Sequence, residues 1–275
     1  MLDPCYDSYA PAVALAGARA VRVALGAKTG FGVDWKAVEA AANAKTRLLI
    51  LNTPHNPTGA ILREGDITKL RALMRAHPQL LLVSDEVYEH MVFDGHTHHS
   101  MLRHPDLAAR SFVVSSFGKT YHCTGWKLGY CVAPAELSQE FRKVHQFNTF
   151  SSFTPVQIAI AEMLHKHPEH HRGLSDFYQE KRDAFQRQLR EQTLLTPLDV
   201  PGGFFQLVDY SRVSDLSDYE FCRWLTIEHG VTAIPLSPFY HSPPPGQRLA
   251  RLCFAKESAT LTAAIDRLGR IQPKR

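Results

Sequence analysis

The sequence predicts an α/β protein with a mainly parallel sheet in its larger N-terminal part and a smaller α+β domain at its C-terminal end. Continuous apolar runs, typical of strands buried on both faces, recur between residues 47 and 134 with helix-like stretches between them. After Pro134 the pattern changes to long charged helices and short strands. We expect the large domain to span residues 1–168 and the small domain residues 169–275, entered through a long helix.

The strands of the large sheet are expected at residues 47–51, 80–84, 111–117 and 128–134. Helices are expected at 34–44 and 64–77, ahead of the first two strands, and Pro78 ends the second helix. The C-terminal part is expected to contain helices at 135–147, 175–192 and 258–271 and strands at 204–210, 231–237 and 250–255. Ser175 is the predicted N-cap of the helix that begins there.

The composition argues against several classes of protein. The net charge is +4 and the basic residues form no block or arm, so we expect no nucleic-acid partner. The five cysteines are odd in number and form no CxxC pair, which favours a reducing, cytoplasmic location over a disulfide framework. Because no run approaches about 20 apolar residues and the N-terminus does not resemble a signal peptide, we expect no membrane association.

Polar side chains follow three of the predicted strands directly. Asn52 and the turn sequence "NPTG" follow the first, Asp85 and Tyr88 follow the second, and Lys119 follows the third. Since ligands bind beyond the carboxyl ends of parallel strands, these groups could converge on one crevice. An amine, a carboxylate, a phenol and an amide together suit pyridoxal phosphate, whose aldehyde binds a lysine and whose ring nitrogen needs a carboxylate.

With these residues in place, the chain resembles the class I/II aminotransferases of the pyridoxal-phosphate fold type I. The branch it resembles most contains methionine and kynurenine (glutamine-type) aminotransferases. The resemblance covers nearly the whole chain, in the family's order, and rests on these stretches: "NTPHNPTG" (52–59), "SDEVYEHMVFDG" (84–95), "SSFGKTYHCTGWKLGY" (115–130), "GGFFQLVDYS" (202–211), "GVTAIPLSPFY" (230–240) and "RLCFAKE" (251–257).

The resemblance assigns a cofactor role to each residue near the strand ends. Lys119 is the implied Schiff-base lysine, which also moves the substrate Cα proton, rather than a lysine of a surface loop. Asp85 is the implied partner of the pyridine nitrogen, although an aspartate after a strand also suits a helix N-cap. Tyr88 and Asn56 are implied to bond the phenolate oxygen, and Asn56 could in addition form an Asx-turn.

The resemblance also implies phosphate and ring contacts. Ser116 and Lys127 match the family's phosphate ligands, and Lys127 keeps the positive charge where some members carry arginine. Tyr6, two residues after Pro4, resembles the aromatic residue that stacks on the pyridine ring.

Two further residues are implied to act on the substrate, with Asn56 beside them. Arg251 corresponds to the arginine that binds the α-carboxylate, since a guanidinium in an apolar strand needs a partner; the alternative is an edge-strand arginine. Phe150 matches an aromatic residue that one subunit inserts into its partner's site. The stretch 146–153 contains no arginine for a distal carboxylate, so we expect a neutral donor of the methionine, aromatic, kynurenine or glutamine type.

The histidine-rich segments "HTHH" (96–99) and "HKHPEHH" (165–171) have the composition of metal sites but not their strict ligand spacing. Histidine clusters on polar segments are usually solvated. We therefore predict no metal.

The predicted activity is transfer of an amino group to a 2-oxo acid by a ping-pong Schiff-base mechanism. The alternative enzyme is a cysteine-S-conjugate β-lyase of the same fold, which would use the same lysine and aspartate. Because full-length relatives carry a further N-terminal segment, a truncated or degenerate, inactive chain is a third possibility. The resemblance implies a homodimer with shared active sites.

Overall fold

A computed structural model describes residues 1–273, which form two compact units. Unit 1 comprises Met1–Gly32, His55–Ala60 and Asp176–Arg275, and unit 2 comprises Val33–Pro54 and Ile61–Ser175. The boundary predicted between residues 168 and 169 lies just before the C-terminal segment of unit 1. The first 32 residues belong to the same compact unit as that segment. The division of the chain into domains 1–168 and 169–275 stays a prediction.

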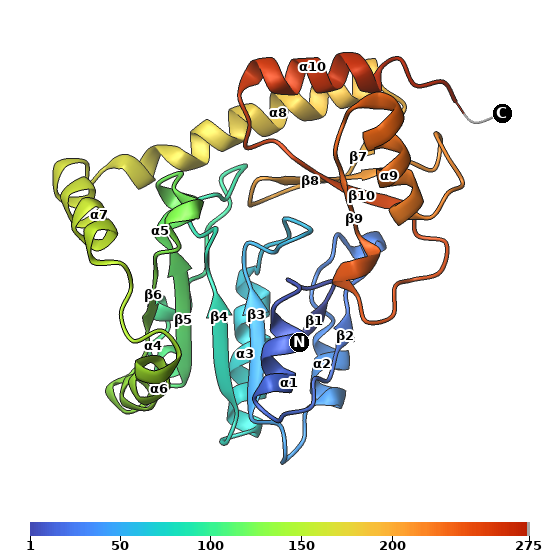
Figure 1. The fold of residues 1–275 in the computed structure, drawn as a ribbon. Helices are drawn as coiled ribbons and strands as arrows, with labels where there is room; N and C mark the ends of the chain where they lie inside the picture. The colour runs from blue at the N-terminus through green and yellow to red at the C-terminus, as the bar shows by residue number, and fades with distance from the viewer. Residues whose placement is uncertain (274–275) are drawn as a thin grey trace. The chain divides into compact units, whose positions relative to one another are not determined.

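Unit 2 is built on a four-stranded sheet in the order β3-β4-β5-β6 (Figure 1). The first three strands are parallel, with Asn52 opposite Asp85 and Val83 opposite Phe112. The carboxyl ends of β3, β4 and β5 therefore lie along one edge, as the sequence predicts for a ligand site. The strands are β3 (Leu48–Asn52), β4 (Leu81–Asp85), β5 (Ser111–Ser116) and β6 (Gly129–Val132).

The strand β6 departs from the predicted parallel arrangement, because it runs antiparallel to β5 with Ser116 opposite Gly129. Between the two strands lie only short helices, α5 (Phe117–Thr120) and the 3-10 helix Thr124–Trp126. A parallel return usually runs through a full crossover helix, and this connection contains none, which suits an antiparallel pair.

Helix α3 (Glu64–Ala76) of unit 2 buries its apolar face, and α2 (Trp35–Ala41) is bound to it. In α3 the buried residues Ile67, Leu70, Leu73 and Met74 recur at helical spacing. The Trp35 indole of α2 donates to the Asp66 carboxylate at 2.7 Å and ties these two helices together. The remaining helices are α4 (Pro105–Ala108), α6 (Ala135–Asn148) and α7 (Thr154–Lys166).

Unit 1 contains a second sheet, antiparallel and ordered β7-β8-β10-β9, together with a two-stranded parallel pair, β1-β2. The predicted strand at 231–237 is shorter than expected, because Ser237–Phe239 forms a 3-10 helix instead. The strands are β1 (Leu2–Asp3), β2 (Val23–Ala24), β7 (Thr196–Pro197), β8 (Phe205–Asp209), β9 (Ile234–Pro235) and β10 (Leu249–Cys253).

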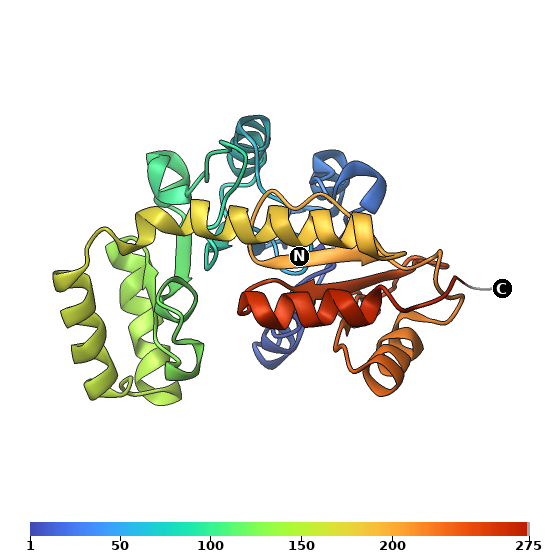
Figure 2. The same ribbon diagram turned by 90° about the horizontal axis from the view of Figure 1, so that it is seen from above.

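Two long helices, α8 (Leu174–Gln192) and α10 (Ser258–Leu268), lie side by side over one face of this sheet (Figures 1 and 2). The predicted N-cap of α8 is wrong. Ser175 lies inside the helix, which continues from the 3-10 helix His170–Gly173, and its hydroxyl bonds the Val92 carbonyl. The other helices of unit 1 are α1 (Tyr9–Leu15) and α9 (Asp218–His229).

Within residues 1–273, every helix is too short or too polar to span a bilayer.

Candidate active site

The ends of β3 and β4 are fixed to each other by backbone and side-chain hydrogen bonds. The Asn52 amide and the Thr53 backbone N–H both donate to the Asp85 carbonyl, each at 2.9 Å. The Asp85 carboxylate in turn accepts from the Val87 backbone N–H at 3.2 Å. This Asx-type turn fixes the direction of the chain immediately after β4.

The two predicted cofactor ligands after β4 differ in exposure. Asp85 is half-buried, and Tyr88 is 3% exposed. Asp85 ends β4, and Tyr88 lies in the turn that follows, closed by the Glu89 N–H to Glu86 carbonyl bond at 2.8 Å. The D-x-x-Y spacing therefore delivers a carboxylate and a phenol from one rigid corner of unit 2.

Sequence reasoning missed Glu86, whose carboxylate lies beneath this corner with 0% exposure. It accepts from the Ser84 hydroxyl at 2.8 Å, from His98 at 2.9 Å and from the Met101 backbone N–H at 3.0 Å. Burial alone would raise the pKa of the Glu86 carboxyl, but these bonds leave it below its ordinary value. Glu86 is therefore an anion that anchors the 98–101 segment to β4.

A second missed carboxylate, Glu89, joins the next two strands. Its oxygen accepts from the Ser115 hydroxyl at 2.8 Å and from the Tyr130 hydroxyl at 2.9 Å. Burial and the neighbouring carboxylate raise the pKa of the Tyr130 phenol to about 12, so it remains a donor. The acidic positions one turn apart in "SDEVYEH" were the available signal for both residues.

The segment after β5 presents Ser116 and Lys119 on a tightly folded loop. The Ser116 hydroxyl accepts from the Gly118 backbone N–H at 3.1 Å and caps the short helix α5 that carries Lys119. A Cβ atom on Gly118 would lie 2.8 Å from the Thr124 Cα, so only glycine fits. Lys119 is half-buried. The predicted lysine is thus held on a short, constrained turn.

Lys127 closes the same loop. It adopts the left-handed conformation, with φ of 54°, after the 3-10 helix Thr124–Trp126, and it is exposed. Its neighbour Gly129 also cannot carry a side chain, because a Cβ there would lie 2.6 Å from the Ser115 carbonyl oxygen. One loop of unit 2 therefore carries Ser116, Lys119 and Lys127, as the sequence predicted.

In unit 1, Asn56 lies in a buried turn and is 8% exposed. The His55 N–H donates to the Ala60 carbonyl at 2.8 Å, and the His55 ring pairs with the Thr58 hydroxyl at 2.7 Å. Burial lowers the pKa of His55 to about 4, so its ring is neutral at neutral pH. A Cβ on Gly59 would lie 2.7 Å from Val200, which explains the glycine of "NPTG".

Arg251 and Asn56 meet although they lie far apart in the sequence. The guanidinium donates to the Asn56 side-chain oxygen at 2.6 Å. The guanidinium carbon lies 4.0 Å from the centre of the Phe205 ring and 4.9 Å from that of Phe239, neither of which the sequence indicated as a site residue. Two aromatic rings and one amide oxygen therefore fix the orientation of the arginine.

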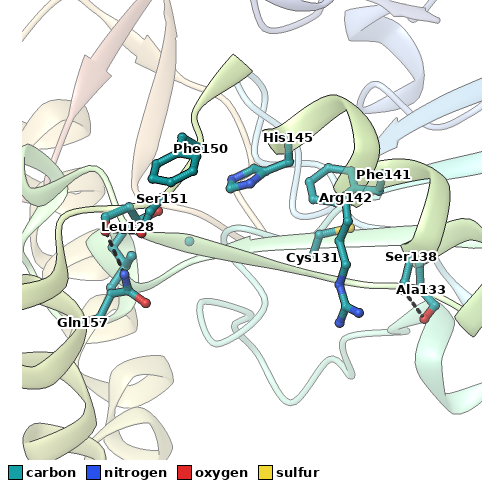
Figure 3. Close-up of a pocket in the computed structure, with 12 residues that line it drawn as sticks. Leu128, Cys131, Ala133, Ser138, Phe141, Arg142, His145, Phe150, Ser151 and Gln157 are labelled. Carbon is teal, nitrogen blue, oxygen red and sulfur yellow. Dashed lines mark hydrogen bonds between the residues drawn. The ribbon is translucent and has the colours of Figure 1, made fainter. Parts of the chain in front are cut away.

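The two remaining predicted residues are largely exposed. Tyr6 is 42% exposed and meets Tyr9 edge-on, with ring centres 5.6 Å apart. Phe150 is 80% exposed, in the left-handed conformation with φ of 64°, and lines a groove beside β6 (Figure 3). Their assignment to cofactor and substrate stays a prediction.

Among the described residues, two histidines of the segment 96–99 lie close to carboxylates. Glu86, Glu89 and His98 bring their potential ligand atoms within 4.8 Å of one another. The carboxylates already accept from serine, tyrosine and backbone donors, so we interpret the group as a hydrogen-bonded network. Of the "HTHH" segment, His99 lies 3.5 Å from the exposed Glu64 carboxylate.

Comparisons with known proteins show what the chain is similar to. The sequence profile of the family described as aminotransferase class I and II matches residues 1–268. The chain is 53% identical to methionine aminotransferase of Escherichia coli K12 over 98% of its own length and 69% of that protein. It is 36% identical to mouse kynurenine–oxoglutarate transaminase 3, over 96% of its own length and 64% of the relative.

Solved structures give the same picture. An E. coli structure, reported with a methionine aminotransferase function, matches with a TM-score of 0.93 and 52% identity. The match covers 98% of this chain and 70% of the E. coli chain. The N-succinyldiaminopimelate aminotransferase of Mycobacterium tuberculosis matches with a TM-score of 0.92 and 35% identity, over 98% and 70% of the two chains.

Proposed function

Because the chain belongs to the class I and II aminotransferases, we propose that it moves an amino group from a neutral amino acid to a 2-oxo acid with pyridoxal phosphate. The family depends on this cofactor, and the fold is that of the pyridoxal-phosphate transferases of fold type I. The observation that carries the proposal is the 53% identity to a methionine aminotransferase over 98% of the chain. We therefore expect methionine among its donors.

The side chains that follow the strands of unit 2 fit this cofactor in chemical type. A carboxylate, a buried phenol, a hydroxyl and two amines occupy Asp85, Tyr88, Ser116, Lys119 and Lys127. Gly118 and Gly129 allow the chain around the Ser116–Lys127 loop to pack tightly, because a Cβ atom at either position would collide with the neighbouring backbone. When bound, pyridoxal phosphate supplies an aldehyde for the substrate amine and a ring that accepts electrons from Cα.

Each of these residues has a proposed task. Asp85 would keep a proton on the ring nitrogen, and the Val87 N–H bond to its carboxylate holds the side chain in position. Tyr88 donates to the phenolate oxygen, and Ser116 and Lys127 bind the phosphate. Lys119 would hold the cofactor through its side-chain amine and would move the substrate Cα proton as a general base and acid.

In unit 1, Arg251 is proposed to bind the substrate α-carboxylate. Its guanidinium lies against the Phe205 and Phe239 rings and donates to the Asn56 oxygen. A planar fork held in this way binds a carboxylate through two parallel hydrogen bonds. Asn56 is proposed to serve both groups, by orienting Arg251 and by bonding the cofactor's phenolate oxygen. Tyr6 is proposed to stack on the ring.

We further propose a homodimer and a cytoplasmic location, as the resemblance implies. The 80% exposure of Phe150 supports a contact with a second subunit, where it would line the partner's substrate pocket.

Product analysis tests the function. The purified chain, supplied with pyridoxal phosphate, methionine and a 2-oxo acid, is expected to release the 2-oxo acid of methionine and to form the amino acid of the acceptor in equal amounts. With a cysteine conjugate as sole substrate, a β-lyase would instead release pyruvate, ammonia and a thiol without an acceptor. Release of the latter products alone would contradict the proposal.

A further inference from the structure

Two histidines from distant segments of the chain meet in unit 2. The His90 and His171 rings have centres 4.8 Å apart, and their planes are inclined by 46°, so the rings do not stack face to face. Two imidazoles that bind one tetrahedral zinc ion through nitrogens at about 2.0–2.1 Å have ring centres about 5 Å apart. The pair therefore has the separation that two ligands of a single metal ion require.

The segment that carries His171 is held in place by the preceding residue. The His170 ring donates to the Thr120 carbonyl at 3.2 Å and stacks on the Tyr121 ring, with ring centres 5.3 Å apart. These two contacts fix the start of the 3-10 helix that carries both histidines against the end of α5. They hold His171 beside His90 before any ligand binds.

His90 belongs to the corner that follows β4, which is closed by the Glu89 N–H to Glu86 carbonyl bond at 2.8 Å. Its Nε2 atom lies 3.9 Å from the Glu89 carboxylate, whose negative charge favours a cation beside the ring. Burial holds the pKa of His90 below its ordinary value, despite the opposing charge of Glu89. The imidazole is therefore neutral at neutral pH, as a metal ligand must be.

A pocket of about 360 Å³ lies beside the pair. Both histidines line it, together with Phe117, Tyr121 and Tyr130, among others. The His90 side chain remains 31% exposed, so an ion can enter from solvent. Water from the pocket can occupy the coordination positions that two imidazoles leave open.

We propose that His90 and His171 form a binding site for a zinc ion, whose coordination water completes. Neutral imidazole is a ligand that zinc favours in proteins. A bound ion would join the corner that carries Tyr88 to the 3-10 helix that leads into α8. The spacing within "HKHPEHH" predicts no metal, because one of the two ligands comes from a different segment of the chain.

A zinc titration tests the site. The untagged chain, stripped of metal with a chelator, is titrated with zinc chloride alone in a calorimeter. We expect one ion to bind each chain with micromolar affinity, and X-ray absorption at the zinc edge to show two imidazole ligands with oxygen ligands completing the shell. Neither measurement needs cofactor or turnover, so both outcomes are independent of the proposed function.

Substitutions locate the bound ion. His90→Gln and His171→Gln each remove one ligand and are expected to weaken zinc binding by about tenfold or more. His165→Gln, at an exposed position of the same histidine-rich segment, is the matched control and should leave the affinity within about twofold. Circular dichroism checks that each variant is folded. If the corner after β4 does not tolerate the change at His90, then His171→Gln and its control decide the test.

Four outcomes would overturn the proposal. They are absence of zinc binding, zinc bound without imidazole ligands, an affinity unchanged by both substitutions, and an equal loss in the control. Binding that survives both substitutions and is lost in His98→Gln would place the ion at the Glu86–Glu89–His98 group instead, and would equally contradict the assignment.

Discussion

At the scale of single residues, Arg251 shows how neighbours define the use of a charged side chain. The Phe205 and Phe239 rings lie against its guanidinium, and Asn56 accepts one of its N–H groups at 2.6 Å. The aromatic surfaces displace water and leave the planar fork to bind a carboxylate. A lysine would supply the charge without the fork, which gives a direct test of the proposed role.

Arg251→Lys is therefore expected to raise KM for methionine by about tenfold or more, corresponding to about 1.4 kcal/mol of lost binding, with a smaller change in kcat. Arg270→Lys, at an exposed position, is the control and should leave both constants unchanged. Steady-state kinetics of both variants provide the measurement. An unchanged KM in Arg251→Lys would show that the arginine does not bind substrate.

Lys119→Ala is expected to abolish covalent attachment of the cofactor, because the side-chain amine that binds the aldehyde is removed. Borohydride reduction followed by peptide mapping should label Lys119 in the unmodified chain and give no lysine label in the variant. Lys143→Ala, on the exposed surface of α6, is the control and should keep the label on Lys119. Label on Lys127 or Lys143 in the unmodified chain would contradict the assignment.

At the scale of elements, the tight connections decide where the functional side chains lie. The β5–β6 connection folds so closely that a Cβ atom on Gly118, or on Gly129 at the start of β6, would collide with the backbone. A Cβ atom on Gly125, in the same connection, would meet no other atom within 4 Å. The sequence predicted the strand at 128–134 as part of a parallel sheet, and its antiparallel direction corrects that prediction. The connection holds only short helices and no full crossover helix, and β6 pairs antiparallel with β5.

Gly118→Ala is expected to lower the free energy of unfolding by about 1–3 kcal/mol, because the new methyl group meets the Thr124 backbone and forces the loop to shift. The same shift should weaken cofactor binding, since Ser116 and Lys119 flank this position. Gly125→Ala is the matched control and should have a much smaller effect on both. Urea denaturation and a cofactor titration check these outcomes; equal losses in the two variants would contradict the steric argument.

The turn that carries Asn56 is expected to make stability depend on pH. Burial lowers the pKa of His55 to about 4, so the folded chain binds this proton less readily than the unfolded chain, where histidine titrates near 6.5. The contribution of the neutral ring is complete above about pH 6.5 and is lost as the pH falls toward 4, by about 3 kcal/mol. Urea denaturation across this range measures the loss.

His55→Gln should flatten this part of the pH profile, although its stability at neutral pH will also change because the bond to Thr58 is altered. His165→Gln, at an exposed position, should keep the profile of the unmodified chain. The same slope in all three proteins would show that His55 is not the group responsible.

At the scale of the whole molecule, substrate choice depends on what the chain lacks as well as on what it contains. The stretch 146–153 offers Phe147 and Phe150, which are 87% and 80% exposed, and no arginine. The resemblance places the group that a second subunit inserts into the substrate pocket at this stretch. An aromatic ring there favours an apolar side chain and leaves a distal carboxylate without a partner.

A donor screen is therefore expected to rank methionine and aromatic amino acids above aspartate by about tenfold in kcat/KM. The rates of 2-oxo-acid formation from each donor, with one fixed acceptor, provide the comparison. A screen in which aspartate outpaces methionine about tenfold would contradict both the neutral-donor prediction and the role of this stretch.

The local features of this protein could be predicted from its amino-acid sequence. The strand that ends at Asp85, the D-x-x-Y corner with Tyr88 and the spacing of Ser116, Lys119 and Lys127 all depend on residues close together in the chain. Apolar periodicity and turn chemistry act over such short distances, so they can be read from one sequence. The α/β class follows from the same patterns, and the fold confirms it.

The long-range features could not be predicted and became visible in the folded chain. The pairing of Arg251 with Asn56, the Phe205 and Phe239 rings around it, and the buried carboxylates of Glu86 and Glu89 join segments that no local pattern connects. The antiparallel course of β6 and the exposed aromatic face of α6 likewise appear only once the elements have packed. The physical reason is that many pairings of helices and strands are compatible with one sequence pattern, and tertiary packing selects one of them. The pattern shows which face of an element is buried but not which other element covers that face.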